Sequence, residues 1–189
     1  IMACVDAVRA SRIAGIDLDS DALWLSVSAC VRPEKLCRAM AQRCDIRLNS
    51  PVENVEPVRE GWCVEGEIFD AVILAAGPGV MRLSQTNWLP LSPVRGQLAG
   101  CSSGPVSARL ACNLNYGGYC TPAFEDTHVL GASFEPGRED TGIDTGTTDE
   151  LLTGLNRIAP ALASDMRPVT ARAGLRVTAK DRRPVIGPV

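Results

Sequence analysis

The chain has 189 residues and a formal net charge of -3, with 46% hydrophobic and 22% charged residues. Disordered chains have fewer apolar residues and a larger net charge, so this composition predicts a globular protein of one or two domains. No apolar run is long enough to span a bilayer, and the first residues lack the basic segment of a secretory signal. We therefore expect a cytoplasmic protein with no membrane partner. Because the sequence begins at Ile1 rather than Met and ends in an apolar stretch, we also expect a piece of a longer protein.

The chain contains eight cysteines but only one histidine, His128. No two cysteines have C-x-x-C spacing, so the sequence predicts no zinc site and no bound metal. Cys37 and Cys44 fall on one face of an expected helix, where a free cysteine behaves as a small buried hydrophobe. Reduced thiols of this kind are typical of cytosolic proteins.

The first half of the chain alternates between expected strands and an expected helix. A strand is predicted over residues 22–31, followed by a helix over 33–44 that a proline opens. Short strands are predicted next at 45–48 and 52–58. The apolar run 69–77 ends in glycine, which is typical of a strand that a parallel sheet covers on both faces.

The second half changes to successive strands separated by Gly, Pro and Ser turns, which predicts an antiparallel sheet. After an acidic loop at 135–150, Thr147 and Glu150 have capping-box spacing. A leucine-rich helix is therefore expected to begin there and to break at Pro160. The expected strands of this half are 91–99, 108–114, 118–121, 128–133 and 167–177.

This change of pattern predicts a mixed α+β and α/β fold with two domains. The α/β layer is expected to comprise residues 31–84 and 180–189. The antiparallel sheet is expected to comprise residues 1–30 and 85–179.

Three segments are candidates for chemistry, and the first is the end of the apolar run. Ala75, Ala76 and Gly77 are small residues at the carboxyl end of an expected buried strand. Small residues there let a ligand approach the backbone closely, although an ordinary strand-to-helix turn explains them equally well.

The second segment is the Arg95-Gly96-Gln97 step inside an expected strand. Glycine weakens a strand unless something must pass near the backbone. A ligand and a β-bulge are both open explanations.

The third segment is the last expected strand, where Arg176 lies between Leu175 and Val177. A guanidinium on a sheet face is suited to bidentate binding of a carboxylate. A solvated arginine is the alternative.

Taken in this order, the three segments resemble the D-amino-acid oxidase (DAO) superfamily of FAD-dependent amine oxidases. The run 70–77 looks like the second FAD-contacting strand of that family. The strongest match is to its closing motif, which is represented here by Gly174-x-Arg176 followed by Asp181, Pro184, Ile186 and Gly187.

A narrower likeness is to the C-terminal oxidase half of the bifunctional tRNA wobble-uridine enzymes of the MnmC type. Four strings carry this resemblance, and the most distinctive is Leu89-Pro90-Leu91-x-Pro93-Val94-Arg95-Gly96-Gln97. The others are Pro33-x-x-Leu36-Cys37-Arg38-Ala39, Gly118-Tyr119-x-Thr121-Pro122 and Gly131-Ala132-Ser133-Phe134. The resemblance implies part of a Rossmann-like FAD-binding layer and an antiparallel-sheet substrate domain, truncated at both ends. It also implies oxidative removal of the carboxymethyl group from carboxymethylaminomethyl-uridine in tRNA, with FAD as cofactor and glyoxylate as product.

The same resemblance implies roles for individual residues. Arg176 would anchor the substrate carboxylate and Tyr119 would hydrogen-bond it, so both are candidate catalytic and substrate-binding residues. Arg95 and Gln97 are further candidate substrate contacts. The candidate FAD contacts are Val52 at the adenine end, together with Ala75, Ala76, Gly77 and Gly187.

One part of the family pattern is missing, because the sequence has no G-x-G-x-x-G fingerprint for the cofactor pyrophosphate. We therefore expect this chain by itself to bind FAD weakly or not at all and to be inactive. Two alternatives stay open: an enzyme like glycine oxidase that acts on a free small amino acid, and a non-catalytic binding domain. The net charge gives no electrostatic help for RNA, although the basic tail could contact it locally or could simply be solvated. The basic residues of that tail are Arg172, Arg176, Lys180, Arg182 and Arg183.

Overall fold

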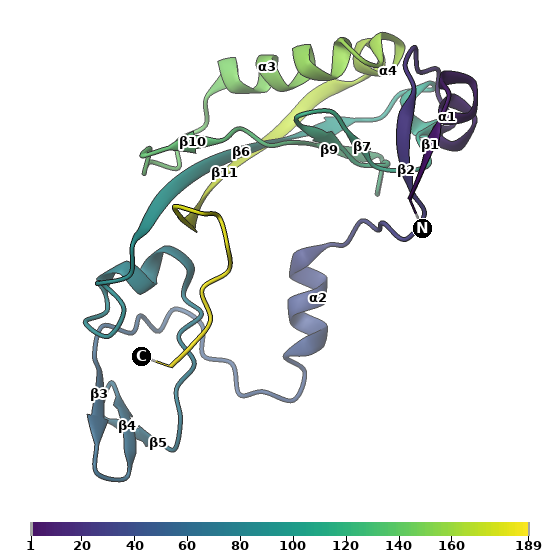
Figure 1. Cartoon of the computed structure of the whole chain (residues 1–189). Helices are drawn as coiled ribbons and strands as arrows, with labels where there is room; N and C mark the ends of the chain where they lie inside the picture. Colours follow the sequence, from purple (N-terminus) through teal and green to yellow (C-terminus); the bar gives the residue numbers. More distant parts are fainter. Residues whose placement is uncertain (1, 189) are drawn as a thin grey trace. The chain divides into compact units, whose positions relative to one another are not determined.

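The computed structural model describes residues 2–188, which form two compact units (Figure 1). The first unit comprises residues 1–31, 95–135 and 140–174, and the second comprises residues 32–94, 136–139 and 175–189. Two of the borders, 94/95 and 174/175, fall inside long strands. The sequence pattern predicts these borders at 84/85 and 179/180 instead. Composition changes where one kind of element gives way to another, and it does not show where the contacts of a single long strand change from one unit to the other.

The first unit begins with a β-hairpin interrupted by a helix. Strand β1 (Met2–Val5) pairs antiparallel with β2 (Ala22–Leu25), and α1 (Ala7–Ala14) lies between them in the sequence. Asp6 caps α1 by accepting a hydrogen bond from the Arg9 amide at 2.8 Å. The predicted strand over 22–31 is therefore correct only for its first four residues.

A mixed set of long and short strands forms a six-stranded sheet with the order β10-β6-β9-β8-β7, in which β11 also pairs with β6. The pairs with a defined register, β6–β9, β7–β8 and β8–β9, are antiparallel, as the turn pattern predicts. A short 3-10 helix, η2 (Ser107–Arg109), connects β6 to β7, so the predicted strand 108–114 is wrong except at its last residue. The strands are β6 (Leu91–Ser102), β7 (Leu114–Asn115), β8 (Tyr119–Cys120), β9 (Thr127–Gly131), β10 (Glu135–Pro136) and β11 (Arg167–Ala179).

Two helices cover one face of this sheet (Figure 1). They are α3 (Thr145–Asn156) and α4 (Pro160–Asp165), so the predicted break at Pro160 is confirmed. The predicted start at Thr147 is wrong, because Asp144 is the N-cap and accepts a hydrogen bond from the Gly146 amide at 2.9 Å. The core between helices and sheet includes Leu155 and Leu162, which are 0% and 1% exposed.

The second unit contains one helix, a 3-10 helix and a small sheet. Its elements are α2 (Pro33–Met40), β3 (Val55–Val58), β4 (Gly61–Val64), β5 (Glu67–Phe69) and η1 (Gly77–Arg82). Strand β4 pairs antiparallel with both β3 and β5. None of the described helices is long and apolar enough to cross a membrane.

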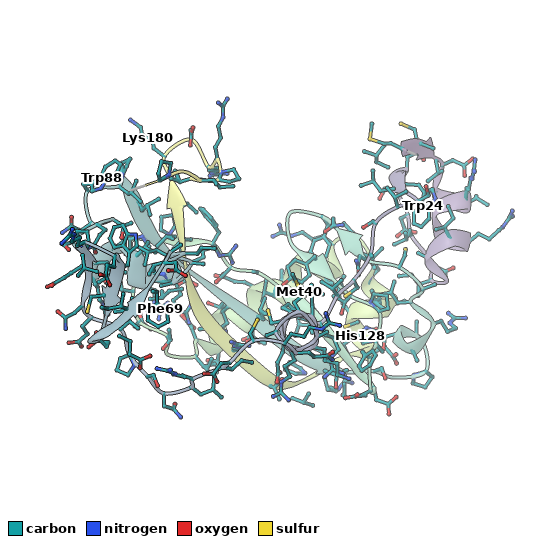
Figure 2. The ribbon with its side chains drawn as sticks, turned by 90° about the horizontal axis from the view of Figure 1, so that it is seen from below. Trp24, Met40, Phe69, Trp88, His128 and Lys180 are labelled. Atoms are coloured by element: carbon teal, nitrogen blue, oxygen red, sulfur yellow. The ribbon has the colours of Figure 1, made fainter. Side chains whose placement is uncertain are left out.

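Several local predictions for this unit are wrong. Residues 45–48 form no strand, and the predicted strand 52–58 is present only as β3. The helix ends at Met40, so Cys44 lies outside it, and both Cys37 and Cys44 are exposed rather than buried. Residues 70–76 form no strand, and Ile73 is 91% exposed. A parallel strand needs hydrogen bonds from its neighbours, and no described segment pairs with this run. Met40 and Phe69, at the ends of α2 and β5, are likewise 77% and 42% exposed (Figure 2).

Candidate functional site

The large sheet of the first unit has one covered face and one open face. Alternate residues of β6 point to opposite faces, and Ala99 and Cys101 belong to the core under α3 and α4. Register places Leu130 opposite Ala99, so Leu130 shares the covered face. Leu98 and Gly100 consequently lie on the open face.

Tyr119 lies on the open face, where a glycine leaves room for its ring. Its neighbour Cys120 points into the core, and register pairs Tyr119 with Gly131. A Cβ atom at Gly131 would lie 2.5 Å from Tyr119 Cζ, 2.6 Å from Tyr119 Oη and 2.6 Å from Leu98 Cδ2. The tyrosine ring therefore passes over the Gly131 backbone and ends beside Leu98.

Strand β11 carries arginines on the same open face. A Cβ atom at Gly100 would collide with Thr170 Oγ1, so the Thr170 side chain lies on the open face. Alternation then places Arg172 on this face too, and its side chain is exposed. Within residues 2–188 the Arg172 guanidinium forms no hydrogen bond and no ion pair.

Arg176, the predicted carboxylate anchor, belongs to the second unit. It is exposed, whereas Leu175 and Val177 on either side are half-buried, so the alternation expected for this strand is present. Among the described residues, nothing neutralises its guanidinium by a hydrogen bond or an ion pair. The side chain is thus available to an anion, which is the property that the predicted role requires.

The covered face contains a buried polar network around Arg95. Arg95 Nη1 donates to Glu135 Oε1 at 2.5 Å, and Nη2 donates to Gln97 Oε1 at 2.8 Å and to the Gly142 carbonyl. The Gln97 side chain continues the network, because Oε1 accepts from the Asp144 amide at 2.9 Å and Nε2 donates to the Asp144 carbonyl at 2.6 Å. The two side chains therefore attach the acidic loop and the start of α3 to β6.

This network changes how Arg95 and Gln97 are interpreted. The sequence predicts that both contact substrate, but both side chains are 0% exposed and have partners inside the protein. Direct substrate contact stays a prediction, and the role that the geometry supports is to hold the loop. Glu135 is the partner that the sequence did not single out. An arginine in an apolar strand, with an acid-rich loop later in the chain, was the only available signal.

His128 is buried on the covered face, where register pairs it with Cys101. Its Nδ1 is 2.8 Å from the Thr121 carbonyl, which can only accept, so Nδ1 carries the proton. Within residues 2–188, Nε2 of this histidine has no hydrogen-bond partner. No group of three or more potential metal ligands occurs within the described residues.

Three buried groups near this core have perturbed acidities. Burial raises the pKa of the Cys120 thiol to about 12, and the nearby Cys101 contributes in the same direction. Burial also raises the pKa of Tyr116 to about 12, with smaller contributions from both thiols. Burial likewise raises the pKa of Cys101. These thiols are protonated at neutral pH and are therefore poor nucleophiles.

The predicted FAD contacts all belong to the second unit. Val52 is 46% exposed, and Ala75 and Ala76 are exposed. Gly77 opens η1 with a positive φ of 54°, and a Cβ atom there would meet nothing within 4 Å, as is also true of Gly187. The five positions are accessible, and their FAD contacts stay predictions.

A cofactor of this size also needs a loop for its pyrophosphate, formed by glycines at a helix N-terminus. The described helix of this unit, α2, begins with Pro33 after Arg32 and has no glycine at its start. The residues present therefore fit only one edge of the cofactor. The small side chains at 75–77 leave room for it, but none of the described residues forms the phosphate loop.

The fold is that of a flavin-dependent amine oxidase. The structure aligns over 99% of its length with glycine oxidase from Geobacillus kaustophilus, with a TM-score of 0.85, 20% identity and 54% of that chain covered. Iminodiacetate oxidase from Chelativorans aligns over 100% of this chain and 55% of its own, with a TM-score of 0.80 and 21% identity. Residues 5–189 match the family of FAD dependent oxidoreductases called DAO. The chain belongs to this family.

Curated relatives give a narrower likeness. The tRNA 5-methylaminomethyl-2-thiouridine biosynthesis bifunctional protein MnmC of Legionella pneumophila is 28% identical over 187 residues. This match covers 98% of the present chain and 28% of that protein. The MnmC protein of Methylobacillus flagellatus is 32% identical over 197 residues, which cover 98% of this chain and 30% of its own length. The chain thus spans less than a third of these relatives, and the DAO and MnmC-type resemblance seen in the sequence is confirmed.

Proposed function

We propose that this chain is part of an FAD-dependent oxidoreductase that removes the carboxymethyl group from carboxymethylaminomethyl-uridine at the wobble position of tRNA. The observation that carries the proposal is Arg176, a cation that is exposed and unpaired among the described residues and lies in the strand matching the family's closing motif. The similarity to MnmC proteins over nearly the whole chain supports tRNA as the substrate.

The group to be removed is a glycine unit attached to the base, and it ends in a carboxylate. The Arg176 guanidinium can hold this carboxylate by two parallel hydrogen bonds, which fix its orientation as well as its position. Tyr119 offers a hydroxyl on the open face of the sheet in the first unit, and its hydrogen bond to the substrate stays a prediction. FAD, for which the small residues 75–77 leave room, would supply the two-electron oxidation of the glycine unit's C–N bond, and water would then release the oxidised fragment as glyoxylate.

The polar network around Arg95 supports this function from the covered face. The network attaches the acidic loop to β6 and so holds this strand in place. The opposite face of β6 carries Leu98, which lies beside Tyr119. A rigid strand is a precise support for a ligand, because a displacement of about 1 Å can cost roughly a hundredfold in rate. Arg95 is therefore a proposed positioning residue.

The experiment that tests the function is a titration with FAD followed by addition of tRNA that carries the modified uridine. It is done on this chain and on a full-length protein that contains it. We expect the full-length protein to bind FAD and the flavin to bleach on addition of that tRNA, whereas this chain binds FAD weakly. Bleaching by free glycine and not by the tRNA would favour the amino-acid oxidase alternative. Failure of the full-length protein to bind FAD would favour a binding domain.

The role of Arg176 is tested in the same full-length protein. Losing one partner of a desolvated charge pair costs about 2 to 5 kcal/mol, so Arg176→Gln should lower kcat/KM by a factor of roughly 30 to several thousand. Arg43→Gln is the matched control, because Arg43 is also exposed and belongs to the same unit. An equal effect of both substitutions would exclude a specific carboxylate anchor.

A further inference from the structure

The open face of the large sheet carries a second cation that the proposed chemistry does not use. The proposed substrate has one carboxylate, and Arg176 is the guanidinium proposed to bind it. Arg172 precedes Arg176 in β11 and is exposed, and its guanidinium has no hydrogen bond or ion pair among residues 2–188. An exposed arginine has many possible explanations, so its surroundings decide the interpretation.

Contacts between β11 and β6 locate Arg172 on the sheet. Ser102 Oγ donates to the Arg167 carbonyl at 3.4 Å, and Thr170 packs against Gly100. From the first contact to the second, the residue number falls along β6 and rises along β11, so these two strands are antiparallel. The next residues of each strand on the open face are then Leu98 and Arg172.

This position places Arg172 on the row of residues that ends at Tyr119. Leu98 is beside Gly131, and the Tyr119 ring crosses Gly131 to reach Leu98. The Arg172 guanidinium, the Leu98 side chain and the Tyr119 ring therefore follow one another across β11, β6, β9 and β8, all within the first unit.

The charge on this face has one sign. In β6, β8 and β9, alternation gives the open face only neutral residues, including Ser92, Thr127 and Val129. The acids of the polar network are Glu135, Asp140 and Asp144, and they contact Arg95 or Gln97, whose side chains lie on the covered face. Nothing on the open face of these described strands neutralises Arg172, so an anionic partner fits there.

An RNA phosphate fits this arrangement better than a second carboxylate. A free amino acid has a single carboxylate, which leaves Arg172 without a function. A nucleotide in RNA has a phosphate as well as the modified base, and single-stranded RNA is bound by arginines beside aromatic side chains on open sheets. Arginine matches the geometry of phosphate oxygens by the same two-pronged donation that it offers a carboxylate.

We infer that Arg172 binds a backbone phosphate of the RNA substrate and so makes the enzyme prefer an RNA-borne glycine unit to a free amino acid. This inference rests on the proposed function, because it requires an RNA substrate. It adds a residue whose contribution is to substrate choice and not to the oxidation.

The first test measures binding and does not depend on activity. A fluorescent anticodon stem–loop RNA is titrated with this chain at several KCl concentrations between about 50 and 200 mM. Each lost phosphate contact lowers the slope of log K against log salt by about 0.7 to 0.9. We expect Arg172→Gln to lower the slope by that amount and to weaken binding about tenfold at the lowest salt, and Arg172→Lys to keep most of the slope.

The matched control is Arg9→Gln, because Arg9 is exposed in the same unit but belongs to α1 and not to a strand of this sheet. Circular dichroism establishes that each variant is folded. An equal loss for Arg9→Gln and Arg172→Gln would overturn the inference by showing only a general effect of net charge. If the unsubstituted chain does not bind the RNA at all, the inference is overturned as well.

The second test separates this inference from the proposed function. In the full-length enzyme with FAD, Arg172→Gln should raise KM for the modified tRNA and leave kcat/KM for the free modified nucleoside, which has no phosphate, unchanged. Equal losses on both substrates would overturn the inference and leave the proposed oxidase intact. If neither substrate is oxidised the proposed function fails, and the binding measurement still decides whether Arg172 contacts phosphate.

Discussion

The ion pair between Arg95 and Glu135 should be a large single contribution to the stability of the first unit. Arg95→Met keeps the long apolar stem but removes the guanidinium and its hydrogen bonds to Glu135, Gln97 and Gly142. Removing one partner of a buried pair costs about 3 to 5 kcal/mol. Because the Glu135 side chain is 24% exposed, water compensates part of the loss, and we expect a value of about 3 kcal/mol.

Urea unfolding followed by fluorescence measures this value for the unit concerned. Trp24 is in the first unit, whereas Trp62 and Trp88 are in the second. A background with phenylalanine at those two positions therefore reports on the first unit alone. For a chain of this size each kcal/mol shifts Tm by roughly 2 to 4 °C, so a lowering of about 6 to 12 °C should accompany the change in urea midpoint.

A double-mutant cycle with Glu135→Gln tests the cause. This change removes the nearer carboxylate partner of the Arg95 guanidinium, which is 0% exposed, and leaves Asp140 Oδ1 at 3.9 Å from Nε, so it should destabilise by an amount comparable to Arg95→Met. The double mutant should be more stable than the sum predicts by about 1 to 3 kcal/mol. Arg9→Met, at an exposed site, should change stability by less than about 0.5 kcal/mol. An Arg95→Met effect as small as that control, or additive single mutants, would refute the reasoning.

Three further outcomes follow from the buried thiols, the buried phenol and the open face. Cys101 and Cys120 should resist a thiol reagent at pH 8 in the native chain and react only on unfolding, because burial raises both pKa values; rapid labelling by mass spectrometry would contradict this. With Tyr119→Phe as background, absorbance should show phenolate of Tyr116 near pH 12 and not near 10. Since the folded pKa is the higher one, the folded state retains the proton longer, so this group's stabilisation is complete below pH 10 and is lost between about pH 10 and 12; a transition near 10 in the folded chain would refute burial of the hydroxyl. Gly131→Ala should displace the Tyr119 ring and destabilise the chain by about 1 to 3 kcal/mol, as measured by urea unfolding; an unchanged midpoint would show that the ring does not cross the glycine.

The helix predictions show which signals act locally. Pro160 ends one helix and begins the next as predicted, because proline lacks an amide hydrogen and restricts the residue before it. The capping box at Thr147 did not mark the helix start, since Asp144 competes as a cap and its own carbonyl and amide are bonded to Gln97. A cap is a local signal, but choosing between two caps depends on residues far away in the sequence.

The apolar run 69–77 shows the opposite limit. Its composition is that of a buried strand, yet β5 ends at Phe69 and the following residues have no strand partner among those described. Apolar composition makes burial favourable, but a strand also needs a neighbour that supplies hydrogen bonds. The sequence identified the segment and could not identify that neighbour.

The sequence by itself determined the successive antiparallel strands, the break between α3 and α4, and the family resemblance, including the arginine strand around Arg176. These features depend on side-chain alternation, turn residues and proline, which act over a few neighbouring residues. Only the tertiary structure decided that Arg95 is paired with Glu135, that Tyr119 crosses Gly131, and that Arg172 shares the open face with Tyr119 and not with the acids. Such contacts join residues tens of positions apart, and the free energy that selects them comes from burial and charge pairing, which exist only after the chain has folded.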